Sequence, residues 1–339
     1  MDQSGRLIPV LSCSPSSTGR NRRLAPVSTL IFDERMSCIT CASTQFSSAW
    51  SATYNDLDVQ KYMDLYGYAV DWRSELEGKP ISLVACAACE TLFHQHILQP
   101  DSLERLYSDW IDEDQIDTLS GNLESPLDSE TQFQTASENV RHLLRLNRIL
   151  GGDRDKQPPW RVLDFGCGAA EFLKQASLFG FETWGVDFST TRKAQALHNQ
   201  ISIIASLEAY KEVAHAPVHA ITLFQVLEHL DRPRRTLIEL ASVLAADGIL
   251  IVEVPHCASG RGKPRSFEEF RNVHPLEHIN AFTPETLTTL VESAGFTKIK
   301  PGPPHVTSHP GALGRSELTR FYEPKRTKQY FRKGSTPPA

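Results

Sequence analysis

The sequence predicts an α/β protein with a doubly wound, mostly parallel sheet, preceded by a small cysteine-containing module. Residues 161–187 have the pattern strand, glycine turn, helix and second strand, which is a βαβ unit. Apolar strands and amphipathic helices go on alternating to residue 300, as in a parallel sheet covered by helices on both faces. Two Cys-x-x-Cys pairs lie ahead of this region and predict a separate unit.

The composition restricts the class of protein. A length of 339 residues suggests two domains, or one large domain with tails. A composition of 40% hydrophobic and 22% charged residues is ordinary for globular proteins. The net charge of −6 argues against a surface built for nucleic acid, which needs a basic face. The sequence has no apolar run long enough to span a membrane and no apolar signal segment. Paired cysteines fit a reducing compartment, so we expect a cytoplasmic protein.

Three segments carry weak structural signals. Residues 1–30 are rich in Ser, Arg and Pro, which predicts a disordered leader and leaves a transit peptide open. Residues 111–130 are acidic and predict a linker. Residues 324–339 are basic and predict a solvated tail.

The four paired cysteines are Cys38, Cys41, Cys86 and Cys89. Four thiolates can form the closed tetrahedron of a structural zinc site, and we place such a module at residues 31–110. The residues between the two pairs, 42–85, exceed the usual ribbon spacing of roughly 15–20, so this aromatic-rich insert must loop out. Buried thiols or a single redox pair are the alternatives.

The βαβ unit begins at Val162 and turns at Gly166–Cys167–Gly168. Glycines lack a Cβ and let the backbone approach a ligand above the helix N-terminus. Asp187 follows the second strand, where a carboxylate would accept hydrogen bonds from a ribose diol. The pattern indicates a nucleoside-containing ligand, with an ordinary βα turn as the alternative.

These residues resemble a known family. VLDFGCGAAEFL (162–173) and WGVDFS (184–189) are similar to motif I and its successor in class I S-adenosylmethionine-dependent methyltransferases. ITLFQVLEHL (221–230), DGILIVEVP (247–255) and HINAFTPETLTTLVESAGF (278–296) follow in the expected order. The resemblance implies a Rossmann-like, seven-stranded sheet, which we place at residues 131–323. Ala170 departs from it, because the family usually has a third glycine there. A nicotinamide-binding domain is disfavoured, because Glu171 replaces the last glycine of that fingerprint.

The cysteine module adds a second resemblance. Residues 85–110 are similar to the zinc-ribbon segment that precedes some methyltransferase domains, including sugar C-methyltransferases of antibiotic pathways. The large C-terminal domain of those enzymes has no counterpart after Lys300, so their sugar substrate does not carry over. His94 and His96 are fallback metal ligands, and we expect them on the surface.

The class I resemblance assigns a role in binding S-adenosyl-L-methionine to each matching residue. The methionine part would lie against Asp164, Phe165, Gly166 and Gly168. Asp187 would bind the ribose and Phe188 would lie beside the adenine. Phe224 and Gln225 would close the floor of the pocket.

Methyl transfer to a hydroxyl benefits from a base, and His229, with Glu228 beside it, follows a strand end. His278 and His274 are rival bases. Glu-His pairs of ubiquinone-type and small-RNA methyltransferases bind a divalent metal with a second glutamate three residues earlier, where this chain has Gln225. A structural Glu-His pair is the alternative. We expect O- or C-methylation of a small molecule, such as a secondary metabolite or sugar derivative. A non-catalytic scaffold and an RNA or protein methyltransferase remain the other hypotheses.

Overall fold

The computed structural model describes residues 30–111, 129–151, 159–187, 201, 203–213, 216–257, 263–302 and 327–334, without the side chains of 129–134. The expected leader, apart from Leu30, lies outside these residues, as do most of the expected linker and Phe188.

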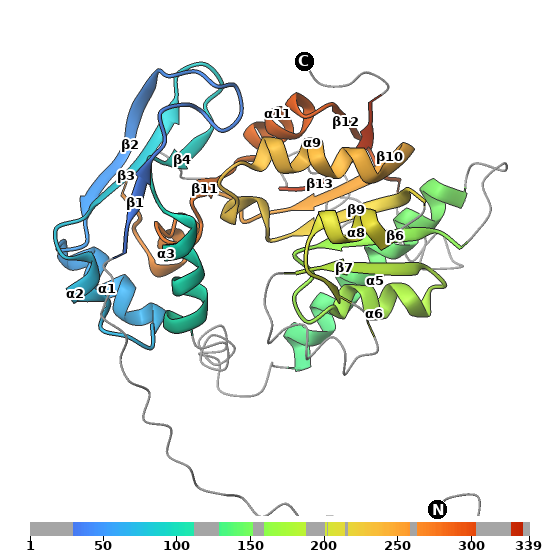
Figure 1. Ribbon diagram of the computed structural model, residues 1–339, viewed down its shortest axis with the longest axis horizontal. Coiled ribbons are helices and arrows are strands. Elements are labelled where there is room, and N and C mark those ends of the chain that lie inside the picture. The colour runs from blue at the N-terminus through green and yellow to red at the C-terminus, as the bar shows by residue number, and fades with distance from the viewer. Residues whose placement is uncertain are drawn as a thin grey trace, which may run out of the picture.

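A seven-stranded sheet forms the larger part of the molecule (Figure 1), in the order β12-β13-β10-β9-β6-β7-β8. All neighbouring strands pair in parallel except β13, which is antiparallel to both β10 and β12. The doubly wound sheet expected from the sequence is therefore confirmed. The strands are β6 (Arg161–Phe165), β7 (Glu182–Val186), β8 (Ile203–Ile204), β9 (Val218–Phe224), β10 (Leu244–Glu253), β12 (Phe296–Ile299) and β13 (Lys328–Lys333).

Helices cover both faces of this sheet. On one face, α5 (Ser129–Gly151) and α6 (Glu171–Leu178) share a core with Val162. On the other face, α8 (Leu207–Val213), α9 (Pro233–Val243) and α11 (Pro284–Ser293) share a core with Leu163. Successive residues of a strand point to opposite faces, so a strand covered on both sides is apolar along nearly its whole length.

Helix α11 shows how local sequence sets the ends of an element. The Thr283 side chain accepts a hydrogen bond from the Thr286 N–H at 3.2 Å, and the Thr286 side chain accepts one from the Thr283 N–H at 3.0 Å. Pro284 occupies the first helical turn, and Gly295 stops the helix with a φ of +91°. A threonine N-cap, a first-turn proline and a glycine after the C-cap therefore define the two ends of this helix.

The prediction of a solvated basic tail at residues 324–339 is wrong for Lys328–Lys333, which form strand β13. Tyr330 and Phe331 are buried in the middle of β13, where Phe331 pairs with Leu250 of β10. The basic residues at both ends of this strand have partners inside the domain: Lys328 Nζ lies 2.8 Å from Glu253, and Lys333 Nζ donates to the Leu244 carbonyl at 2.7 Å. The larger domain therefore extends beyond residue 323.

A smaller unit of sheets and short helices lies beside this domain (Figure 1). Strand β1 (Phe32–Glu34) pairs with β5 (His96–Leu98), and a four-stranded sheet has the order β11-β4-β3-β2. The remaining elements are β2 (Phe46–Thr53), α1 (Leu57–Tyr66), α2 (Trp72–Leu76), β3 (Pro80–Cys86), β4 (Leu92–His94), α3 (Pro100–Arg105), η1 (Leu106–Trp110), α10 (Phe267–Arg271) and β11 (Asn280–Ala281).

The core of the smaller unit is not confined to residues 31–110. Strand β11, which comes after β10 of the large sheet in the chain, pairs antiparallel with β4. Phe270 and Leu276 belong to the same buried cluster as Trp50 and Trp72 from the aromatic-rich insert. His94, expected at the surface, is fully buried, and its Nε2 lies 2.8 Å from the Val273 carbonyl oxygen. The two units are therefore built from interleaved parts of the chain.

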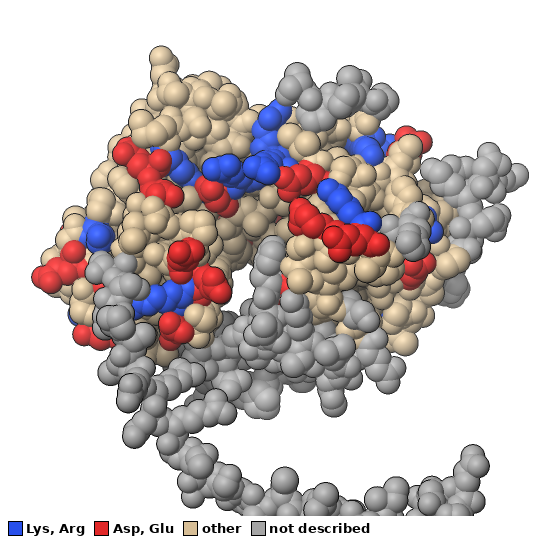
Figure 2. Space-filling model, in the orientation of Figure 1, with Lys and Arg blue, Asp and Glu red and all other residues tan. Residues whose placement is uncertain are grey.

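Basic and acidic side chains lie close together on the face of the molecule shown in Figure 2. None of the helices formed by the described residues is long and apolar enough to cross a lipid bilayer.

Candidate functional site

The glycine turn after β6 bends back over the neighbouring strand. The N–H groups of Gly166 and Cys167 both donate to the Val186 carbonyl, at 2.7 and 3.2 Å. Gly166 has a φ of +74°, and a Cβ at this position would lie 2.5 Å from Val226 Cγ2. Both the backbone conformation and the lack of space require glycine here.

Ala170, where the family usually has glycine, also has a left-handed backbone, with a φ of +63°. It is completely buried and occupies the N-cap of α6. An L-residue pays a cost of roughly 1 kcal/mol or more for this conformation. The departure from the family pattern therefore introduces local backbone strain at the N-cap of α6.

Two carboxylates flank the turn. Asp187 Oδ2 accepts the Gly168 N–H at 2.8 Å, and Asp164 Oδ1 accepts the Thr222 hydroxyl at 2.6 Å. Burial raises the pKa of Asp164 to about 7, and the negative charge of Asp187 adds to this rise. The turn thus has acidic groups beside backbone amides, an arrangement suited to a ligand with a positive charge and hydroxyl groups.

The end of β9 forms the neighbouring wall. The ring of Phe224 packs edge-on against Phe172, with 5.1 Å between centroids. Gln225 has a φ of +58°, is exposed, and donates its N–H to the Glu253 carbonyl at 2.8 Å. The side chain of Phe165 lies in the core, so only its backbone borders the turn.

Directly after Gln225, the short helix η2 (Leu227–His229) carries the Glu-His pair. Glu228 is 1% exposed, and neither of its carboxylate oxygens has a hydrogen-bond partner among the described residues. Burial raises the pKa of Glu228 to about 8. The neighbouring His229 places its Nε2 4.0 Å from Glu228 Oε1.

The side chain of His278, from the segment before β11, lies beside Glu228 and His229. The His229 and His278 rings are nearly perpendicular, with 4.8 Å between centroids. Donor atoms of Glu228, His229 and His278 all lie within 4.8 Å of one another. On the other side, the Tyr107 hydroxyl from η1 lies 3.3 Å from His229 Nδ1. The structure thus brings the three catalytic candidates together and adds a tyrosine from the smaller unit.

His274 is not part of this group. Its Nδ1 accepts the Leu276 N–H at 3.3 Å, and burial lowers its pKa to about 3. Glu277 accepts the hydroxyls of Tyr68 at 2.8 Å and Tyr66 at 3.0 Å, and burial raises its pKa to about 7. These groups form a closed polar network within the smaller unit, which leaves His274 without access to a substrate. The tyrosines lie far away in sequence, so only the aromatic content of the insert hinted at them.

The four paired cysteines form a single cluster. All four Sγ atoms lie within 4.8 Å of one another, with 3.5 Å between Cys38 and Cys89 and the same distance between Cys41 and Cys86. The insert between the pairs loops out, as expected, into β2, α1, α2 and β3.

The two cysteine pairs have matching backbone turns. The Ala42 N–H donates to the Cys38 carbonyl and the Glu90 N–H to the Cys86 carbonyl, both at 3.0 Å. Ala42 and Glu90, each directly after the second cysteine of its pair, have the same φ of +60°. Two equal turns that converge four thiols fit a tetrahedral ion that prefers sulfur ligands.

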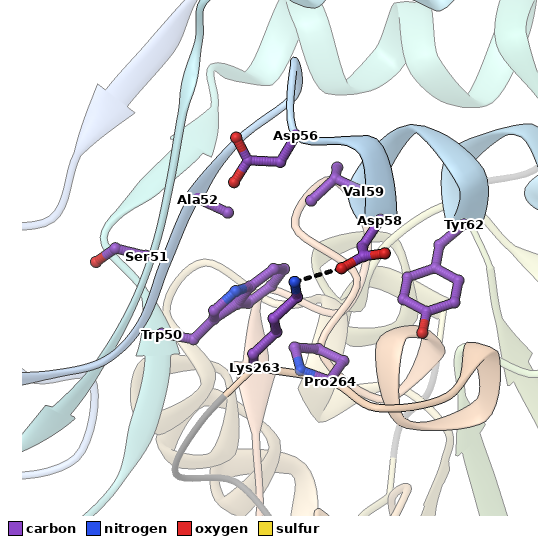
Figure 3. A pocket seen from close by; sticks show the side chains of 9 residues that line it. All are labelled: Trp50, Ser51, Ala52, Asp56, Asp58, Val59, Tyr62, Lys263 and Pro264. Carbon is purple, nitrogen blue, oxygen red and sulfur yellow. Dashed lines mark ion pairs between the residues drawn. The ribbon is translucent and has the colours of Figure 1, made fainter.

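A separate pocket of about 230 Å³ lies in the smaller unit (Figure 3). Lys263 and Asp58 form an ion pair beside the Trp50 ring. None of the candidate site residues above lines it. Ligands of open α/β sheets bind at the carboxyl edge of the strands, and the buried acids of this chain lie at that edge.

The fold and the acid-flanked glycine turn define a class I methyltransferase domain. Residues 130–300, half of the chain, match the model of the family described as "Methyltransferase domain", and the chain belongs to this family.

Two curated relatives come from two strains of Mycobacterium tuberculosis, CDC 1551 / Oshkosh and ATCC 25618 / H37Rv, and both are described as probable S-adenosylmethionine-dependent methyltransferases. Each is 27% identical to this chain over 143 residues, which are 41% of this chain and 49% of the relative. The match thus spans about half the length of these relatives.

Among solved structures, the plantazolicin methyltransferase BpumL in complex with a pentazolic analog and SAH is 17% identical. The match covers 68% of this chain and 94% of that one, with a TM-score of 0.44. The amino pentose methyltransferase CalS10 of Micromonospora echinaspora is 18% identical over 37% of this chain and 57% of its own, with a TM-score of 0.30.

Substitution of Gly166 tests the close approach to Val226. Gly166→Ala should lower the free energy of unfolding by about 1–3 kcal/mol more than Gly180→Ala, the usual cost of overpacking. Gly180 also has a positive φ, +83°, but open space around its Cα, so the pair of variants separates the steric clash from backbone strain. Urea denaturation of both variants measures the difference. Equal losses would contradict the steric constraint.

Proposed function

We propose that this protein transfers a methyl group from S-adenosyl-L-methionine to a small-molecule acceptor. The observation that carries the proposal is the juxtaposition of the glycine turn, with its two acids, and the Glu228–His229 turn, with Val226 between them. Membership of the methyltransferase family supports the choice of cofactor. A scaffold that has lost catalysis would bind the cofactor without turnover, so turnover separates the two hypotheses.

The cofactor supplies a methyl group already activated as a sulfonium. The backbone of Gly166 and Gly168 would border its methionine part, and Asp164 would balance a positive charge there. Asp187, oriented by the Gly168 N–H, would accept from the ribose hydroxyls. Phe224 and Gln225 would close the binding site at the end of β9, and Phe188 is assigned to the adenine by the family resemblance alone.

At the acceptor side, His229 is the proposed base. Its side chain is 28% exposed, so it can reach a substrate, whereas Glu228 beside it is 1% exposed. The Tyr107 hydroxyl and the His278 ring contact the imidazole from two directions and restrict its orientation. An ordered base aligned with the acceptor oxygen or carbon promotes transfer through proximity as well as proton removal.

The same three donors offer a second role for this cluster. A buried carboxylate without a described hydrogen-bond partner and two imidazoles within 4.8 Å could hold a divalent cation that orients the acceptor. Chelator-treated enzyme that regains its rate only with added cation would support that role over the base. An unchanged rate after chelation would support the base.

The four clustered cysteines are proposed to hold one structural zinc ion. Closed Cys₄ sites contribute folding energy and leave no open position for catalysis. The ion would hold together the two Cys-x-x-Cys turns, Cys38–Cys41 and Cys86–Cys89, which we call the cysteine knuckles.

Asp187→Ala tests cofactor recognition. The variant should bind S-adenosyl-L-methionine about 2–3 kcal/mol more weakly, the scale of lost hydrogen bonds to a charged group. Glu182→Ala is the matched control, because Glu182 is an exposed acid at the opposite end of β7. Titration calorimetry measures both affinities. Unchanged affinity in Asp187→Ala would exclude the ribose assignment.

Metal analysis tests the cysteine cluster. Protein purified without chelators should contain about one zinc per chain, because four convergent thiolates form one tetrahedral site. Cys86→Ser should remove the ion and lower the thermal stability, whereas Cys257→Ala, which removes a thiol outside the cluster, should keep it. Zinc-free wild-type protein would leave the four residues as ordinary thiols.

Catalysis is tested on an acceptor identified by screening small molecules with a methyl-labelled cofactor. His229→Ala should lower the methyl-transfer rate by roughly 10²–10⁴-fold, the range for loss of a general base, with little change in cofactor affinity. His256→Ala is the control, because His256 is exposed and outside the cluster. A full rate in His229→Ala together with a loss in His278→Ala would move the base to the later segment. Full rates in both would leave alignment as the source of catalysis.

A further inference from the structure

We infer that Arg35 is a positioning residue through which the cysteine module holds the Glu228–His229 turn against His278. The inference rests on the proposed function only in treating these three residues as the catalytic group. Arg35 lies near the start of the smaller unit, directly after β1, and its side chain extends into the methyltransferase domain. The smaller unit would thus be part of the catalytic machinery.

One side of the guanidinium group binds the segment directly after the catalytic turn. Arg35 Nη2 donates to the carbonyl oxygens of Asp231 at 3.1 Å and Leu230 at 3.4 Å. Arg35 Nε donates to the Asp231 carboxylate at 3.3 Å. These bonds fix the backbone one and two residues beyond His229.

The other side of the guanidinium binds the segment that carries His278. Arg35 Nη1 donates to Asn280 Oδ1 at 2.8 Å and to the Ile279 carbonyl at 3.2 Å. The Asn280 amide in turn donates to the carbonyls of Leu227 at 2.8 Å and Leu230 at 2.7 Å, at the two ends of the catalytic turn. Arg35 and Asn280 together therefore tie both catalytic segments into a single hydrogen-bonded unit.

The chemistry of this site requires an arginine. The Arg35 side chain is 7% exposed, and its acidic partner Asp231 is 52% exposed. Most of its bonds to described residues go to neutral oxygens. Burying a cation among carbonyls is costly unless its donors are satisfied. A planar fork of five N–H groups can reach the divergent carbonyls of two segments, whereas a lysine ammonium cannot. The hydrogen bonds of Arg35 offset the cost of burying its charge, and they fix the position of the two segments relative to each other.

The first cysteine knuckle lies on the same piece of chain. Cys38 follows Arg35 by three residues, and Ile39, between the paired cysteines, packs against the methyltransferase core that contains Leu227. The backbone N–H of Arg35 also donates to the Gln95 carbonyl at 2.7 Å. This bond fixes the backbone of Arg35 to the segment between β4 and β5. A folded knuckle therefore holds the Arg35 side chain where it meets the catalytic turn.

Three variants test the inference: Arg35→Lys, Arg35→Ala, and Arg105→Ala as the matched control. Arg105 pairs with Glu75 at 2.7 Å inside the smaller unit and makes the same kind of partly buried ion pair. In Arg35→Lys and Arg35→Ala, kcat on the screened acceptor should fall roughly 10–100-fold, because small displacements of catalytic groups cost about this much. The cofactor Kd should stay within about twofold of wild type, because the glycine turn is not contacted by Arg35. Added guanidinium should restore part of kcat in Arg35→Ala and none in Arg105→Ala.

Hydrogen exchange measured by mass spectrometry gives a readout that needs no acceptor. In Arg35→Lys, amides of residues 227–231 and 278–281 should exchange faster, while those of residues 164–168 keep their rates. If wild type turns over no acceptor, the proposed function fails, and exchange alone decides whether Arg35 holds the two segments. Unchanged exchange in both segments would overturn the inference. So would an unchanged kcat, or a loss of kcat in Arg35→Ala that guanidinium does not restore and that Arg105→Ala matches.

Discussion

The contact between Gly166 and Val226 is the constraint on which the site depends. The glycine turn ends β6, and Val226 begins the turn after β9, so the missing Cβ lets the ends of two adjacent parallel strands meet. The turn that carries the two acids and the turn that carries Glu228 and His229 then share one edge of the sheet. The residues proposed for cofactor binding and those proposed for proton removal can lie side by side because Gly166 has no side chain.

Much of the fold could be predicted from the sequence because its signals are local. The strand around Leu163 is apolar on both faces, and Thr283, Pro284 and Gly295 define α11 by themselves. Strand β13 could not be predicted in this way. Its two aromatic residues, Tyr330 and Phe331, are flanked by basic residues, and such a pattern is equally typical of a solvated tail. It forms a strand because it pairs with β10, where Phe331 lies opposite Leu250, about 80 residues earlier in the chain. The local sequence pattern does not reveal such a distant pairing.

The proximity of some candidate site residues could also be predicted from the sequence. Asp187 and His229 follow strand ends, and the carboxyl ends of parallel strands meet at one edge, so their proximity follows from topology. The sequence did not separate His278 from His274, because only tertiary packing buries His274 behind Tyr68. Tyr107 and Arg35 belong to a different unit, and residues brought in across an interface show no spacing that would reveal them.

The interleaving of the two units has a consequence for the order in which the chain can fold. Strand β11 and the residues around Phe270 complete the sheet and the core of the N-terminal unit, yet they lie more than 150 residues downstream of it. During synthesis, domains generally fold from the N-terminus as they emerge. Here the first unit to be made cannot finish its core until most of the methyltransferase domain has been synthesised. The cysteine knuckles, which are local, are then the part of that unit able to take shape early.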